Sequence, residues 1–328
     1  YEVFDDLTSG DDNTAVGRRA LTKVTTGSGN TAMGSGTIEL TTTGSNNTGF
    51  GFGALYGNTT ASNNTAVGYD CLSVNTTGTQ NTAVGANAAN ANTTASNVTA
   101  VGYDALTDNT TGASNAAFGS FSLENNTTGG SNTACGHNAL AGNTTASNNT
   151  AVGAGALEVN TTGTANTAMG VFALDANTTG SSNTGLGYGT LTAAQTAENN
   201  TAVGRNAGLS VTSGAQNTLL GAYSADALTS GANNTAVGYE AMGKMTTGSD
   251  NVAVGRAALL DTLSGTGNVA IGVEALENNT GSENTAVGKH ALRGNTTGGS
   301  NVAIGINALN ADDTGSYCVA IGRNALLT

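Results

Sequence analysis

The sequence predicts an all-β protein, a parallel β-solenoid (β-roll) of about 19 coils that forms an elongated rod. The first observation behind this is a pentapeptide like Asn-Thr-Ala-Val-Gly, which recurs in 19 copies at intervals of 17 residues, except for 16 residues between Asn268 and Asn284. The second is the abundance of Thr, Val, Asn and Gly, and the third is the absence of proline. A fixed period through a whole chain is typical of solenoids, and strands bonded on both sides disfavour proline.

Numbering each copy from the Asn of its pentapeptide gives the consensus N-T-A-V-G-x-x-A-L-x-x-N-T-T-G-x-x. Positions 2 and 4 are β-branched or apolar while position 3 is small, and this alternation predicts a short strand near positions 1–5. We expect a second strand near positions 7–11 and turns between the two. Glycine and the Asn-Thr-Thr-Gly segment interrupt each copy too often for a helix. Identical positions then stack in columns about 4.8 Å apart.

The columns with the most constant chemistry are expected to hold the coils together. Position 5 is always Gly, which suits a positive φ or a close backbone approach. Position 1 is Asn in 17 of 19 copies, which predicts a ladder of stacked amides. Position 4 is always apolar and position 9 is mostly Leu, so these two supply the large apolar side chains. Representatives of the four columns are Gly17, Gly34, Gly51, Gly68, Gly85, Asn64, Asn81, Val16, Val67, Leu72 and Leu106.

The repeat extends through the chain without a linker. Residues 1–12 match the consensus from position 6, which predicts a partial N-terminal coil, and 13–328 form a single repeat domain whose last coil is truncated. Because the chain begins and ends within a coil, we expect either a section of a longer protein or ends that join neighbouring subunits.

Self-association is also expected from the small number of large apolar side chains in each coil. Positions 4 and 9 supply only two, so a lone rod would be marginally stable. The small residues at positions 3 and 5 point away from position 4 and permit close approach of another chain. The sequence leaves open which of these two faces is internal.

Three segments carry a resemblance to known fibrous proteins: "NVAIG" at Asn268–Gly272, "NVAIG" at Asn301–Gly305 and "VAIG" at Val319–Gly322. They resemble the head repeats of trimeric autotransporter adhesins of the YadA-like type. The form "NTAVGxxAL…NTTG" is similar to shaft repeats of bacteriophage tail fibres. The resemblance implies a β-roll, assembly of three chains, and attachment to a cell or virion. The period of 17 residues is longer than that of the adhesin heads.

Charge and hydropathy bear on partners and location. The net charge is −13, and no Lys or Arg occurs between Lys23 and Arg205, which disfavours nucleic acid as a partner. No run of 18 apolar residues occurs, so no membrane insertion is expected. A surface of Thr, Asn and scattered carboxylates suits an extracellular filament or virion.

The three cysteines give no disulfide framework. Cys71 and Cys135 lie four coils apart, too far for a disulfide. Cys135 occupies position 4 and is predicted to be a small buried hydrophobic residue. Cys318 is left open to pair between chains.

No catalytic, cofactor-binding or metal-binding site is predicted. His137 and His290 lie nine coils apart, and the carboxylates form no column, so the protein is not expected to be an enzyme. Asn-x-Thr sequons recur at position 12, where two readings stay open: good turn chemistry or a row of glycans. These are Asn58, Asn75, Asn92, Asn109, Asn126, Asn143, Asn160, Asn177 and Asn295.

The sequence therefore favours a structural, self-associating shaft of an extracellular or virion fibre, built as a homotrimer or an end-to-end polymer. The alternative is an adhesin head module that binds a cell-surface glycan or protein through its lateral surface. Tyr69, Tyr103, Tyr188 and Tyr239, all at position 6, could make such contacts or cover a strand edge. An ice-binding solenoid ranks below both, because its Thr pairs are adjacent and lie beside turn glycines.

Overall fold

The computed structural model describes residues 3–311 and 314–327. The chain divides into two compact units, Tyr1–Ala165 and Asn166–Thr328. Each unit is a parallel β-solenoid in which one turn of the chain stacks on the next, as predicted. The described residues contain strands and turns and no helix.

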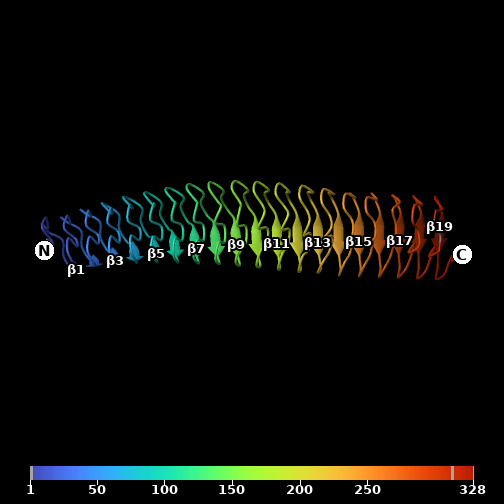
Figure 1. Ribbon diagram of the computed structural model, residues 1–328, viewed down its shortest axis with the longest axis horizontal. Coiled ribbons are helices and arrows are strands. Elements are labelled where there is room, and N and C mark those ends of the chain that lie inside the picture. The colour runs from blue at the N-terminus through green and yellow to red at the C-terminus, as the bar shows by residue number, and fades with distance from the viewer. Residues whose placement is uncertain (1–2, 312–313, 328) are drawn as a thin grey trace. The chain divides into compact units, whose positions relative to one another are not determined.

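In the first unit, each coil contributes one strand of three residues at repeat positions 2–4 (Figure 1). Neighbouring strands pair in parallel with a shift of one copy, so that Thr14 faces Thr31 and Ala15 faces Ala32. The strands are β1 (Thr14–Val16), β2 (Thr31–Met33), β3 (Thr48–Phe50), β4 (Thr65–Val67), β5 (Thr82–Val84), β6 (Thr99–Val101), β7 (Ala116–Phe118), β8 (Thr133–Cys135) and β9 (Thr150–Val152).

The second unit repeats this arrangement. Its strands keep the same register even at the short copy, where Val269 of β16 faces Thr285 of β17. The strands are β10 (Thr167–Met169), β11 (Thr184–Leu186), β12 (Thr201–Val203), β13 (Thr218–Leu220), β14 (Thr235–Val237), β15 (Val252–Val254), β16 (Val269–Ile271), β17 (Thr285–Val287), β18 (Val302–Ile304) and β19 (Val319–Ile321).

The second strand that we expected near positions 7–11 is wrong, because these positions form turns. Positions 7 and 9 lie in the left-handed region, as in Asp70 (φ 46°) and Leu72 (φ 50°), and a strand cannot contain such residues. The glycine at position 5 does have the expected positive φ, between 123° and 145°. A Cβ on Gly68 would lie 2.3 Å from the carbonyl oxygen of Gly85, so the stacking of coils also requires glycine there.

The interior of each coil is lined by position 3 of the strand and by positions 8 and 9 of the opposite turn. Ala66, Leu72 and Leu106 are fully buried. Position 3 packs against the Leu of the preceding coil, since a Cβ on Gly185 would lie 3.5 Å from Leu174 Cδ1. A small residue therefore fits position 3, and position 4 faces outward. Val16 is 55% exposed and Val67 is half-buried, so the position-4 column is not part of the internal core.

Buried asparagines line the interior at position 1 in both units and at position 12 mainly in the first unit, since apolar residues or Thr take position 12 between Asn177 and Asn279. At position 1, Asn30 Oδ1 accepts a hydrogen bond from the backbone N–H of Asn47 at 2.9 Å, and this pattern recurs at Asn64 and Asn81. At position 12, Asn75 Nδ2 donates to Asn58 Oδ1 at 3.0 Å. Both columns donate to the carbonyl at position 15, which lies inside the coil. These bonds satisfy buried polar groups that a thin apolar core could not serve.

Candidate functional site: the outward-facing columns

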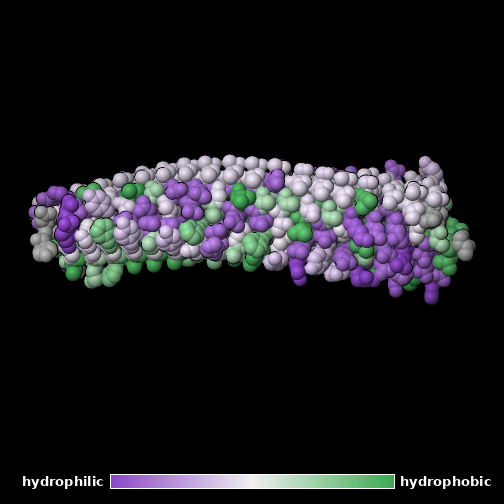
Figure 2. Space-filling view, in the orientation of Figure 1, coloured by the Kyte–Doolittle hydropathy of each residue, from purple (hydrophilic) through white to green (hydrophobic). Residues whose placement is uncertain are grey.

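The outer face of the strands carries a continuous apolar stripe, which we define as the position-4 side chains. In the first unit Val16, Met33, Phe50, Val84 and Phe118 are 55%, 40%, 51%, 38% and 44% exposed. In the second unit Met169, Ile271, Ile304 and Ile321 are 47%, 41%, 41% and 69% exposed. Figure 2 shows hydrophobic atoms gathered along the edge of the first unit where β1 to β5 run in Figure 1. Position 2 on the same face is Thr or Val in most strands. Because position 4 is apolar, none of the strands β1 to β19 has the Thr-x-Thr pattern.

A second outward column, at positions 6 and 7, is rich in aromatic rings. In the first unit the rings of Phe52 and Tyr69 stack with centroids 5.6 Å apart. Phe121 makes edge contacts with Tyr103 at 5.4 Å and with His137 at 5.9 Å. Aromatic pairs of this kind contribute about 0.5–1.5 kcal/mol each beyond burial. The rings therefore brace successive coils while they remain accessible to a partner.

In the second unit the same column combines rings with a cation. Arg205 lies over the rings of Tyr188 and Tyr223, at 5.9 Å and 5.7 Å from their centroids. Tyr223 then meets Tyr239 edge-on at 6.0 Å. Tyr69, Tyr103, Tyr188 and Tyr239 are about half exposed, between 49% and 55%.

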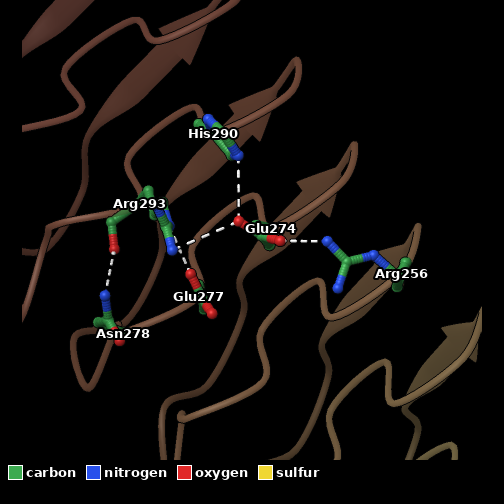
Figure 3. A network of polar contacts seen from close by, with 6 residues as sticks. All are labelled: Arg256, Glu274, Glu277, Asn278, His290 and Arg293. Atoms are coloured by element: carbon green, nitrogen blue, oxygen red, sulfur yellow. Dashed lines mark hydrogen bonds and ion pairs between the residues drawn. The ribbon is translucent and has the colours of Figure 1, made fainter.

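The main charge cluster of the second unit surrounds Glu274 (Figure 3). Its Oε2 lies 3.0 Å from His290 Nε2 and 3.4 Å from Arg293 Nη2, while its Oε1 pairs with Arg256. Partial burial opposes ionisation, but the hydrogen bond from Arg256 and the charges of Arg293 and Arg256 hold the pKa of Glu274 below its ordinary value. In Figure 2 hydrophilic atoms gather over the last coils of this unit.

The cluster spans the short copy, Asn268–Glu283, and ties it to both neighbouring copies. Arg256 precedes this copy, whereas His290 and Arg293 follow it. Arg293 Nε also donates to Glu277, and Asn278 Nδ2 donates to the Arg293 carbonyl at 3.1 Å. The shortened turn keeps its interior asparagine, because Asn279 Nδ2 reaches the Gly281 carbonyl at 2.9 Å. These ion pairs and hydrogen bonds connect the short copy to the copies on both sides of it.

The sequons at position 12 do not lie where a glycan could attach to the folded coil. Asn58 is fully buried, and its Nδ2 donates to Thr41 Oγ1 and to the Ala61 carbonyl, both at 3.0 Å. The burial is shared by Asn75, Asn92, Asn109, Asn126, Asn143, Asn160, Asn177 and Asn295. A glycan on Nδ2 would have to occupy the interior, so the structure replaces the glycan reading with an interior hydrogen-bonded ladder. The recurring Asn at position 12 could have indicated an interior role, because an exposed turn would accept other polar residues.

The cysteines lie on different sides of the coil wall. Cys71, at position 8, is fully buried, and burial raises the pKa of its thiol to about 12. Cys135 is exposed, so the prediction that it is a buried hydrophobic residue is wrong, for the same reason that position 4 faces outward. Both are free thiols, as is Cys318, which is partly exposed.

His137 and His290 belong to different units and to the separate clusters described above. Within residues 3–311 and 314–327 no group of three or more His, Cys, Asp or Glu side chains is placed to hold a metal ion. The same residues include no helix long and apolar enough to cross a membrane. Comparison with models of known protein families finds no match, and comparison with curated proteins finds none either.

Proposed function

We propose that this chain is a structural repeat protein that packs laterally against copies of itself, as the shaft of an extracellular or virion fibre. The observation that carries the proposal is the apolar stripe at position 4, which is exposed in both units. Soluble proteins rarely leave a long continuous apolar patch open to water, and such patches mark interaction surfaces.

A second copy is the occupant that fits the stripe best. The stripe presents one apolar side chain per coil, at the spacing of a parallel sheet, about 4.8 Å. A partner that covers it along its length needs apolar groups at the same spacing, and a solenoid with the same repeat has them. Association through a shared patch leads to closed symmetric oligomers, of which a trimer is one. The extracellular or virion location rests on the resemblance to adhesin and tail-fibre repeats.

The experiment compares the mass of the purified chain with that of two charged variants. Wild type should sediment as an oligomer, with the mass of three chains for a trimer. The variant Val84→Lys/Phe118→Lys, with two changes in the stripe, should sediment as a single chain with an unchanged circular dichroism spectrum. The matched control is Tyr69→Lys/Tyr103→Lys, which places the same charges at the same spacing on position 6, and it should assemble like wild type.

Two results would contradict the proposal. A wild-type chain with the mass of one copy would show that the stripe is not an interface. Assembly that persists in the stripe variant, for instance as long filaments by electron microscopy, would place the contact elsewhere on the coils.

A further inference from the structure

The first unit contains an open groove of about 310 Å³ whose lining includes Arg19, Gly36, Glu39, Phe52, Gly53 and Tyr56. We propose that this groove is a binding site for a neutral saccharide, with room for one or two pyranose rings. The inference does not depend on self-association, because the groove lies on positions 6, 7 and 10 and the apolar stripe lies on position 4.

The groove exists because two successive copies lack a side chain at position 7. Asp70, Asn87, Asp104, Phe121 and Asn138 occupy this position in the next five copies, all with φ between 46° and 57°. Gly36 and Gly53 take its place in the second and third copies. The missing side chain at Gly36 leaves a hollow, whereas at Gly53 the Asp70 carboxylate reaches into the space, with its Oδ1 2.1 Å from where a Cβ would lie. Arg19 bounds one end, and Asp70 bounds the other.

The walls supply the two kinds of surface that a sugar requires. Phe52 and Tyr56 are 56% and 40% exposed, so each offers a ring face against which the C–H face of a pyranose can pack. The ring of Phe52 is held in place by its stack on Tyr69, with an interplanar angle of 11°. An apolar platform that is both exposed and fixed in orientation costs little entropy when a ligand binds.

The floor supplies planar hydrogen-bonding groups. Glu39 is only 2% exposed, and its Oε1 is paired with Arg19, which holds the carboxylate in place. Its Oε2 borders the hollow, 3.5 Å from where a Cβ on Gly36 would lie. A carboxylate can accept hydrogen bonds from two adjacent hydroxyls, and a guanidinium can donate to them.

The charge of the groove points to a neutral ligand. Arg18 and Arg19 face Glu39 and Asp70, so the formal charges of its lining residues cancel. A volume of about 310 Å³ lies at the small end of ligand sites, which suits a sugar rather than a large cofactor. For a ligand with so few atoms we expect a dissociation constant on the order of 1 mM.

The chain itself suggests the variant that closes the groove. Gly36→Asn introduces the residue found at the same position in Asn87 and Asn138, and Asn tolerates the left-handed region. Its Cβ would make ordinary contacts, 3.7 Å from Tyr56 Cδ2, while the rest of the side chain fills the hollow. The matched control is Gly155→Asn, the same change at position 7 with φ 65°, outside the groove lining.

The probes are methyl β-glucopyranoside, methyl β-galactopyranoside and N-acetylglucosamine, with N-acetylneuraminic acid as a charged comparison. Saturation-transfer NMR detects binding and titration calorimetry measures affinity on the full chain. We expect at least one neutral probe to bind, Gly36→Asn and Phe52→Ala to weaken that binding about tenfold or more, and Gly155→Asn to leave it unchanged. No binding by any neutral probe, binding by the acidic sugar alone, or binding unaffected by Gly36→Asn would each overturn the proposal.

Discussion

Each coil carries two apolar columns of similar regularity, position 9 and position 4, but only position 9 points into the interior. Leu140, at position 9, is fully buried, whereas Phe118, at position 4 of the preceding copy, is 44% exposed. The interior is so narrow that Ala from the strand and Leu from the turn fill it. A constant apolar position in a thin solenoid therefore indicates a packing surface without saying on which side of the wall it lies.

The largest effect expected from this comparison is in thiol chemistry. Cys71 should react with iodoacetamide at pH 8 at least about a hundredfold more slowly than Cys135, because its thiol is buried and has a pKa of about 12. Peptide mass spectrometry after timed labelling measures both rates, and in urea they should converge. If position 4 is covered by a second copy, Cys135 should also react more slowly in wild type than in Val84→Lys/Phe118→Lys. Fast labelling of Cys71 in the folded chain would contradict the assignment of the two walls.

Stability should separate the same two columns. Leu140→Ala removes a buried side chain and should lower the free energy of unfolding by about 2–5 kcal/mol. Phe118→Ala removes a larger but exposed side chain and should cost less than about 1 kcal/mol while the chain is monomeric. Urea unfolding at low protein concentration measures both, with Leu106→Ala as a second interior variant. Equal losses of unfolding free energy at positions 4 and 9 would contradict the assignment of position 4 to the outer face of the strand.

The sequence was sufficient to predict the solenoid because its evidence is periodic. The interval of 17 residues, the glycine at position 5 and the Asn at position 1 each recur, and the structure uses them as predicted. The side of the coil on which position 4 lies was not predictable, because alternation within Thr-Ala-Val fits either orientation. Burial of the smaller residue is unusual in ordinary sheets, and here it follows from the left-handed Leu that fills the interior from the opposite turn.

The candidate sites could not be predicted from the repeat, because they lie where the repeat is broken. Gly36 and Gly53 border the same groove because they are neighbours at position 7. Glu274 becomes a hub only because Arg256, His290 and Arg293 lie on adjacent coils around the short copy. In the sequence these residues look like isolated departures from the consensus, and only the stacking of coils shows that they are neighbours.

A repair of the interior ladder should have a smaller, stabilising effect. Val98 replaces Asn at position 1, so it accepts nothing from the next coil, although its own N–H donates to Asn81 Oδ1 at 2.9 Å. Val98→Asn should restore the missing acceptor and raise the free energy of unfolding by about 0.5–1.5 kcal/mol. The reverse change, Asn132→Val, should cost about 1–3 kcal/mol, because it leaves buried groups without partners. Hydrogen exchange of the neighbouring amides measures both, and a neutral or destabilising Val98→Asn would argue against the ladder as a source of stability.

The smallest effect concerns the charges outside the wall, and its sign differs between the two units. The pKa of Glu274 is lowered in the folded chain, so its ionised form contributes stability above about pH 4.5, and that contribution is lost as the pH falls through the lower folded value. Glu274→Gln should therefore destabilise at neutral pH, by less than about 1 kcal/mol, and match wild type in strong acid.

Glu124, in the first unit, behaves oppositely, because burial and then the charges of Asp104 and Asp108 raise its pKa. Glu124→Gln should stabilise slightly at neutral pH and lose that advantage as the pH falls through the raised folded pKa of Glu124 to its ordinary value. Thermal melts between pH 3 and 7 at low salt measure both. If the melting temperatures of the two variants changed with pH in the same way, the opposite signs expected for Glu274 and Glu124 would be contradicted. The ion pairs around the short copy would then not be a source of stability.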